Sequence, residues 1–108
     1  EPKRDYIYIE DIIDLYEKCV LEYEPVKPLI LNAGTGMSYS VAEVIEMVMD
    51  IAGKRKDVLS QEEKRKAEVL NCYADLTKIQ KELGWFAKTD IYEGLKNVYR
   101  HTESLLRE

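Results

Sequence analysis

Four stretches of this chain repeat hydrophobic residues every three or four positions, which is the period of an amphipathic α-helix. They cover residues 11–23, 41–52, 76–83 and 91–105. Short apolar or β-branched runs between them are typical of strands. These runs are residues 6–9, 29–31, 58–59 and 69–73. The order strand, helix, strand, helix, weak strands, helix, helix predicts an α/β fold with a small sheet of short strands.

Polar residues and glycines stand where the predicted helices should begin and end. Candidate N-terminal caps are Ser40 with Glu43, Asp75, and Asp90 with Glu93. The Ser40 and Asp90 pairs have the spacing of a capping box, in which side chains bond the first backbone N–H groups of the helix. Gly53 and Gly84 fall where a helix C-terminus favours a left-handed residue.

Length and charge narrow the function classes. A chain of 108 residues makes one domain, residues 1–108. Its net charge of −5 argues against nucleic-acid binding, which needs a basic face to neutralise phosphates. No apolar run approaches the roughly 20 residues that span a bilayer, and no signal peptide opens the chain, so we expect a cytoplasmic protein.

The few metal-ligating side chains are scattered. Cys19, Cys72 and His101 are far apart in the sequence, so we expect no metal site. Cys19 lies in an apolar stripe and is interpreted as a core residue. Reduced cysteines fit the expected compartment.

Residues 32–36, N-A-G-T-G, form a glycine turn that deserves comparison with phosphate-binding loops. Such turns let backbone N–H groups approach a phosphate. The dinucleotide fingerprint G-x-G-x-x-G needs a third glycine, and Tyr39 stands in its place. We therefore interpret the segment as a tight turn before a helix.

Two Tyr-x-x-x-Lys pairs are candidate proton-transfer sites, because a Lys beside a Tyr lowers the pKa of the phenol. Tyr23 and Lys27 are interrupted by Pro25, which disfavours a helix. Tyr92 and Lys96 share a predicted helix, but Tyr92 falls in its first turn and no Ser or Thr partner is identifiable. We expect no catalytic residue in this chain.

Two arginines have a side chain suited to a diphosphate, because the planar guanidinium can bond two oxygens at once. Arg4 precedes a predicted strand, and Arg65 lies in a charged stretch three residues before Glu68. The residues alone leave open whether they converge on an anion or are ordinary solvated charges.

Five short motifs cover nearly the whole chain. They are R-D-Y-I-Y-I-E-D at 4–11, N-A-G-T-G at 32–36 with S-V at 40–41, R-K-A-E-V at 65–69, A-D-L-T-K at 74–78 with L-G-W at 83–85, and D-I-Y-E-G-L at 90–95. In this order and spacing they resemble extended short-chain dehydrogenases/reductases acting on nucleotide sugars, the NAD-dependent epimerase/dehydratase family. One departure is Lys66-Ala67 in place of Pro-Gly, which loosens the loop that presents Arg65.

The resemblance implies the C-terminal, substrate-binding lobe of such an enzyme, similar to UDP-glucose 4-epimerase, without its Rossmann NAD domain. It assigns Arg4 and Arg65 to the substrate diphosphate, Glu68 to the nucleotide ribose and Asn32 to the edge of the nucleotide pocket. Three other motif residues are interpreted as structural, two as helix caps and one as core packing against the last helix: Asp11, Asp75 and Trp85.

The resemblance also implies what this chain lacks. The NAD turn and the catalytic Tyr-x-x-x-Lys belong to the family's N-terminal region, so NAD is expected in the parent enzyme and no cofactor in this chain. We expect weak nucleotide-sugar binding and no activity alone. Expected partners are the missing NAD-binding domain and a second copy in a homodimer, through residues 11–23 and 29–31. The alternative is a non-catalytic binding or interaction module derived from the same lobe.

Overall fold

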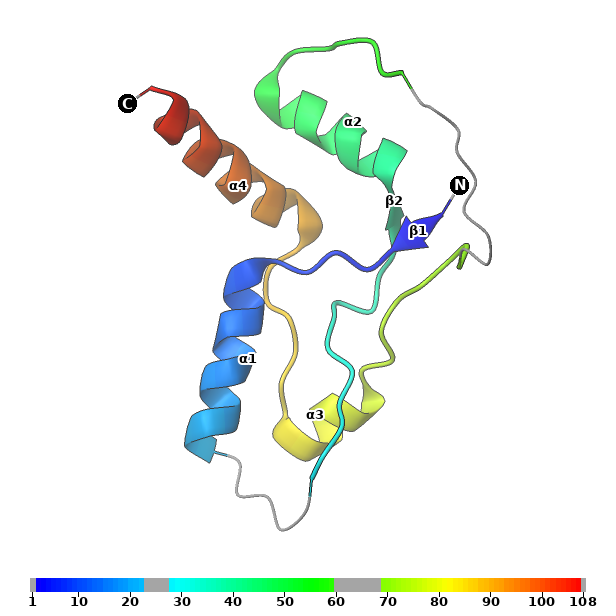
Figure 1. Ribbon diagram of the computed structural model, residues 1–108, viewed down its shortest axis with the longest axis vertical. Helices are drawn as coiled ribbons and strands as arrows, with labels where there is room; N and C mark the ends of the chain where they lie inside the picture. The colour runs from blue at the N-terminus through cyan, green and yellow to red at the C-terminus, as the bar shows by residue number, and fades with distance from the viewer. Residues whose placement is uncertain (1, 23–27, 60–68, 108) are drawn as a thin grey trace.

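The computed structural model describes residues 2–22, 28–59 and 69–107 (Figure 1). Its elements in chain order are β1 (Lys3–Arg4), α1 (Ile9–Glu22), β2 (Tyr39–Ser40), α2 (Val41–Ala52), α3 (Thr77–Leu83) and α4 (Ile91–Leu106). Four helices and a very small sheet among the described residues confirm the predicted fold class.

The sheet lies toward the right of the molecule in Figure 1, next to the start of α2. β1 and β2 pair antiparallel, with Lys3 opposite Ser40. Lys3 also forms an isolated parallel bridge with Asn71. The Lys3 N–H donates to the Leu70 carbonyl over 2.8 Å, and the Cys72 N–H donates to the Lys3 carbonyl over 3.0 Å. The extended segment predicted at 69–73 is therefore confirmed at this bridge alone.

Three of the predicted strands were wrong. Residues 6–8 are irregular and residue 9 already begins α1, while residues 29–31 and 58–59 are irregular too. A strand persists only where a neighbouring strand completes its backbone hydrogen bonds. Within the described ranges, such ladders form only around residues 3–4, 39–40 and 71. The apolar residues at 6–9 and 29–31 therefore do not form strands, and of these residues Ile7 and Leu31 pack against the core.

The helix boundaries were predicted well. At the start of α2, the Ser40 hydroxyl accepts a hydrogen bond from the Glu43 N–H, and the Glu43 carboxylate accepts one from the Ser40 N–H, at 3.1 and 3.3 Å. Asp90 caps α4 by accepting from the Glu93 N–H over 2.8 Å. Gly53 ends α2 in the left-handed conformation, φ 69°. These contacts satisfy backbone groups that a helix end leaves unpaired.

The end of the third helix was predicted correctly and its start only approximately. Gly84 ends α3 with φ 62°. Asp75 accepts from the Thr77 N–H over 3.0 Å, but it lies one residue before the capping position, which Leu76 occupies without a side-chain bond. Asp75 therefore fixes the turn that leads into α3.

The buried core joins α1 to α3. Leu15, Ile79 and Trp85 form it, and Cys19 packs at its edge as predicted. The expectation that Trp85 packs against the last helix was wrong, because this cluster contains no residue of α4. α4 instead packs against α2, and these two helices lie above α1 and α3 in Figure 1. The fold thus has two helix pairs.

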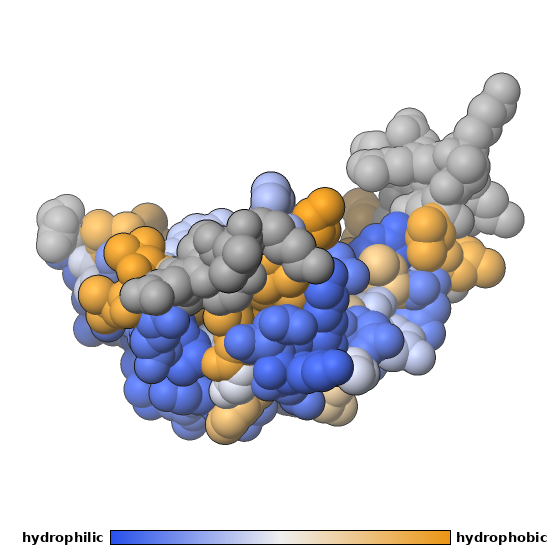
Figure 2. Space-filling view, turned by 90° about the horizontal axis from the view of Figure 1, so that it is seen from below, coloured by the Kyte–Doolittle hydropathy of each residue, from blue (hydrophilic) through white to orange (hydrophobic). Residues whose placement is uncertain are grey.

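The molecule is open and flat. Its Cα radius of gyration is 17.0 Å, whereas a compact chain of this length has one of about 13 Å. Hydrophobic residues are exposed at several places on the face shown in Figure 2. On α1, one set recurs at intervals of four, three and four residues, which places it on a single side of the helix. This α1 stripe consists of Ile9, Ile13, Tyr16 and Val20, between 53% and 82% exposed.

Candidate functional site

The carboxylate of Asp5 is the centre of the densest polar cluster that the structure describes. It accepts hydrogen bonds from the Thr35 N–H at 3.0 Å, the Thr35 hydroxyl at 2.6 Å and the Gly36 N–H at 2.9 Å. A further N–H, that of Ala74, donates to it over 3.0 Å. One half-buried side chain therefore joins three of the sequence motifs, those beginning at residues 4, 32 and 74.

The two glycines of this turn are required for different reasons. A Cβ on Gly34 would lie 2.6 Å from the Asp5 Oδ2 and 2.8 Å from the Ala74 Cβ, so no larger residue fits there. Gly36 has φ 82°, a conformation that costs glycine little. The turn is built around the Asp5 side chain, and its Thr35 and Gly36 N–H groups are bonded to that carboxylate. They do not form a phosphate-binding loop.

The hydrogen bonds also set the charge state of this carboxyl. Burial raises the pKa of Asp5, but the donors from Thr35, Ala74 and Gly36 outweigh it and hold the pKa below the ordinary 3.8. Asp5 is therefore ionised throughout the neutral range, and each donor bonds a full negative charge.

Two of the predicted substrate residues adjoin this cluster. Arg4 directly precedes Asp5, and Asn32 begins the turn that Asp5 holds. One Arg4 guanidinium nitrogen, Nη1, donates to the Val69 carbonyl over 2.6 Å and to the Lys3 carbonyl over 2.9 Å. Asn32 is exposed at the start of the turn that Asp5 holds. The other two predicted residues, Arg65 and Glu68, lie outside the described residues. Arg4 is nevertheless bonded next to their segment, since Val69 follows Glu68 directly.

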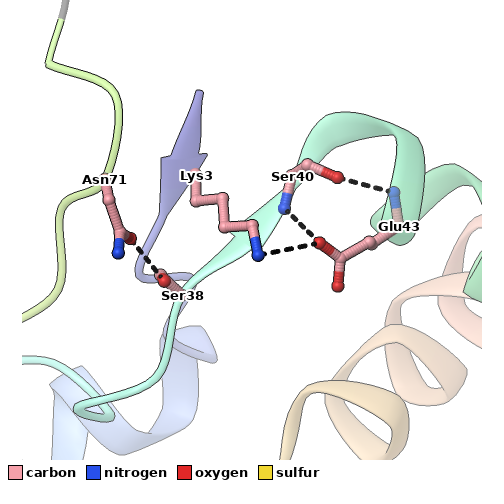
Figure 3. A network of polar contacts seen from close by, with 5 residues as sticks. All are labelled: Lys3, Ser38, Ser40, Glu43 and Asn71. Atoms are coloured by element: carbon pink, nitrogen blue, oxygen red, sulfur yellow. Dashed lines mark hydrogen bonds and ion pairs between the residues drawn. The ribbon is translucent and has the colours of Figure 1, made fainter. Parts of the chain in front are cut away.

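A second polar network holds the sheet beside this cluster (Figure 3). The Lys3 ammonium lies 3.7 Å from the Glu43 carboxylate that takes part in the α2 capping box. The Ser38 hydroxyl donates to the Asn71 side-chain oxygen over 2.6 Å. These contacts tie β1, the start of α2 and the segment around residue 71 into one unit, so Arg4 extends from a braced part of the chain.

Asp11 forms another long-range connection, and its interpretation as a helix cap was wrong. Its side chain is 3% exposed and lies inside the first turn of α1. It accepts from the Thr89 N–H at 3.1 Å and from the Thr89 hydroxyl at 3.3 Å. The helix geometry turns this carboxylate inward, where it holds the segment leading into α4. No local signal identifies this partner, since Thr89 is 78 residues away.

The Tyr92 and Lys96 pair has a geometry unlike that of a proton-transfer site. The Lys96 ammonium lies over the ring of Tyr92, 5.8 Å from its centroid, as in a cation–π contact. The other pair, Tyr23 and Lys27, lies outside the described residues. The expectation that this chain has no catalytic residue stays a prediction.

The described residues contain a further candidate feature, a hollow beside α1. This hollow of about 340 Å³ lies between α1 and the segment after α3 and is lined by residues including Asp11, Asp14, Lys18, Trp85 and Lys88. None of the predicted substrate residues lines it. Among the residues described, no His, Cys, Asp or Glu group is arranged to hold a metal ion, both cysteines are free, and no helix is long and apolar enough to cross a membrane.

Comparisons with known proteins agree on one family. Residues 1–98 match the GDP-mannose 4,6-dehydratase family. The chain is 38% identical over 100 residues, 90% of its length, to UDP-arabinose 4-epimerase 1 of Arabidopsis thaliana. It superposes with a TM-score of 0.79 and 32% identity on UDP-glucose 4-epimerase from Bifidobacterium longum in complex with NAD+ and UDP, covering 88% of this chain. For UDP-glucose 4-epimerase of Thermotoga maritima with UDP-glucose, the TM-score is 0.85 at 28% identity over 98% of this chain.

The same comparisons measure how much of a relative this chain represents. It spans 23% of the Arabidopsis protein, 28% of the Bifidobacterium chain and 33% of the Thermotoga chain. The likeness therefore concerns about a quarter to a third of those proteins.

Proposed function

The chain belongs to the family of NAD-dependent nucleotide-sugar epimerases and dehydratases, and we propose that it forms the nucleotide-sugar-binding lobe of such an enzyme. The observation that carries this proposal is the Asp5 cluster. It brings the strand with Arg4 and the turn with Asn32 together, although they lie far apart in sequence. The two solved structures named above are more than 25% identical to this chain, and both contain UDP or a UDP-sugar. This supports a uridine nucleotide as the ligand class.

The roles proposed for the site residues follow from their chemistry. Arg4 and Arg65 bond the diphosphate oxygens, for which the guanidinium fork is well suited. Glu68 accepts a hydrogen bond from a ribose hydroxyl, and Asn32 supplies an amide at the edge of the nucleotide pocket. These residues bind and orient the substrate, and none of them transfers a proton. The lobe therefore contributes binding energy and positioning to a reaction completed elsewhere in the enzyme.

In the complete enzyme, NAD would supply the hydride acceptor for oxidation of the sugar at C4, the chemistry on which epimerisation or dehydration depends. The groups that hold NAD and move the hydroxyl proton are proposed to lie outside this chain. We accordingly propose that the chain alone has no turnover. The 4-epimerase reaction is the leading candidate, since the curated relative and both structures named above are 4-epimerases.

The open surface supports a covering partner, proposed here to be the NAD-binding domain. Leu15, Ile79 and Trp85 are the only buried hydrophobic residues in the described part of the chain. The α1 stripe exposes four apolar side chains to solvent. Contiguous apolar surface of this kind usually packs against other protein. The α1 stripe is therefore the proposed contact surface.

Titration calorimetry with UDP-glucose tests the binding part of the proposal. Arg4→Ala and Arg65→Ala should each weaken binding by about 1.5–3 kcal/mol, the contribution of a hydrogen bond to a charged group. Arg100→Ala is the matched control, because Arg100 is exposed on α4, away from the Asp5 cluster. Binding that is indifferent to both site arginines would contradict the proposal.

A second assay tests the proposed inactivity. The chain is incubated with NAD and UDP-glucose or UDP-galactose, and products are separated by chromatography. We expect no conversion above a protein-free blank. Conversion that disappears in Tyr92→Phe would show that the pair on α4 is catalytic after all. Absence of UDP-glucose binding in the calorimetry would instead favour a non-catalytic interaction module.

A further inference from the structure

Asp5 is not one of the residues assigned to the substrate, yet it lies between two that are. It follows Arg4 directly in the chain, and its carboxylate holds the turn that starts at Asn32. The hydrogen bonds from Thr35 and Gly36 fix this turn, and the bond from Ala74 fixes a third segment against it. The Asp5 carboxylate is thus the shared anchor of the two substrate segments.

The packing around this anchor leaves the turn little freedom. The backbone at Gly34 passes so close to the Asp5 Oδ2 that a Cβ would lie 2.6 Å from it. Gly36 adopts φ 82°, and its N–H donates to the same oxygen over 2.9 Å. A shift of the turn by even a fraction of an ångström would lengthen bonds from Thr35 and Gly36 together. The position of Asn32 relative to β1 therefore depends on one side chain.

The other side of the anchor is fixed as well. Arg4 pairs within the sheet, and its guanidinium donates to the Val69 carbonyl over 2.6 Å. Lys3, next to it, is braced by the ion pair with Glu43 (Figure 3). These contacts hold β1 without Asp5, so the segment that Asp5 additionally holds in place is the turn.

We propose that Asp5 is a positioning residue for nucleotide-sugar binding, which sets the Asn32 turn at a fixed place relative to Arg4 so that both reach one ligand. This inference rests on the proposed function. In it, the Asp5 carboxylate does not touch the ligand; its contacts are with Thr35, Gly36 and Ala74. Its effect on binding is transmitted by the turn alone.

A purely structural role for Asp5 makes a different prediction. In that case Asp5→Asn lowers the unfolding midpoint but leaves the affinity of the folded protein unchanged. A positioning role lowers the affinity of the folded protein, and it makes Asn32→Ala redundant once Asp5 is altered. A double-mutant cycle between Asp5 and Asn32 separates the two, because residues acting through one another are not additive.

The experiment titrates UDP into the wild-type chain, Asp5→Asn, Asn32→Ala and the double variant. Each titration is made well below the unfolding midpoint, with the folded fraction checked by circular dichroism. Amide hydrogen exchange reports whether the N–H groups of Thr35, Gly36 and Ala74 lose protection. Asp14→Asn is the control, because Asp14 is an exposed carboxylate on α1 that faces the separate hollow.

We expect Asp5→Asn to raise the Kd for UDP at least about tenfold, with faster exchange at the three amides. Asn32→Ala should add no more than about twofold in the Asp5→Asn background. Asp14→Asn should change neither readout. If Asp5→Asn does not fold, Thr35→Val should raise the Kd severalfold while retaining the backbone donors to Asp5. It removes the hydroxyl donor at 2.6 Å together with the two bonds of that hydroxyl to the Met37 backbone.

Three results would overturn the inference, and the last is distinguishable from the first two. If wild type binds UDP but Asp5→Asn binds it equally well with its three amides exposed, the positioning role is wrong and the proposed function stands. Full additivity of Asp5→Asn and Asn32→Ala has the same meaning. If wild type does not bind UDP, the proposed function fails and this inference fails with it.

Discussion

Gly34→Ala should destabilise the chain more than an ordinary glycine substitution, because of what the added methyl group would meet. Its Cβ would lie 2.6 Å from the Asp5 Oδ2 and 2.8 Å from the Ala74 Cβ. Neither obstacle is the free end of a flexible side chain. The carboxylate is held by donors from two segments, and the Ala74 Cβ is fixed to its backbone.

The magnitude follows from the two ways to relieve this overlap. Overpacking a well-filled site costs about 1–3 kcal/mol when neighbours shift slightly. If the turn moves away instead, hydrogen bonds to the Asp5 carboxylate are lost, each contributing about 1.5–3 kcal/mol before allowance for partial exposure. We therefore expect Gly34→Ala to lower the free energy of unfolding by about 2–4 kcal/mol.

Urea unfolding followed by circular dichroism measures this change. Gly53→Ala is the matched control, since nothing lies within 4 Å of its Cβ and only its left-handed φ of 69° is affected, at about 1–2 kcal/mol. Ala74→Gly in the Gly34→Ala background should recover part of the loss by removing the atom 2.8 Å away. A Gly34→Ala stability within about 0.5 kcal/mol of wild type would refute the packing argument.

Three other predictions concern stability and association. Asp11→Ala should cost about 1–3 kcal/mol by leaving the Thr89 N–H unpaired, whereas Asp14→Ala on the same helix should cost under about 0.5 kcal/mol in the same urea assay. The pKa of Asp5 is lower in the folded than in the unfolded chain, so the stability that the ionised carboxylate contributes is present above the unfolded pKa and is lost as pH falls through the folded pKa. The difference in unfolding free energy between wild type and Asp5→Asn should therefore shrink from about pH 6 to about pH 3. A constant difference would contradict this. We also propose that the isolated chain forms a two-fold dimer through its α1 stripe: light scattering should show a mass that falls on hundredfold dilution and becomes monomeric in Ile13→Asp, while a monomer at the highest concentration would exclude this.

Helix ends were readable from the sequence because they depend on local chemistry. The Ser40 and Glu43 pair, the Asp90 cap and the glycines after α2 and α3 each act on backbone groups within four residues. Such signals require no knowledge of the rest of the fold. The predicted helices accordingly agree with the observed ones to within two residues at most described ends.

Strands and long-range contacts were not readable in the same way. Residues 6–9 have strand-like composition, but a strand depends on a partner that composition does not name. The carboxylates of Asp5 and Asp11 bond residues 30 to 78 positions away, so nothing near them in sequence shows what they hold. The one usable signal for Asp5 was the glycine turn itself: a turn with several N–H groups and no phosphate site needs an acceptor elsewhere in the chain.

The most direct test of the central claim maps where UDP binds, by following backbone amide chemical shifts of the labelled chain during a titration. The account predicts shifts that cluster at Arg4, at residues 32–36 and around Val69, which follows Glu68 in the chain. It also predicts that residues lining the hollow beside Trp85 stay unchanged. Shifts confined to that hollow, or no shifts even at UDP concentrations high enough to detect weak binding, would contradict the claim that this lobe binds the nucleotide.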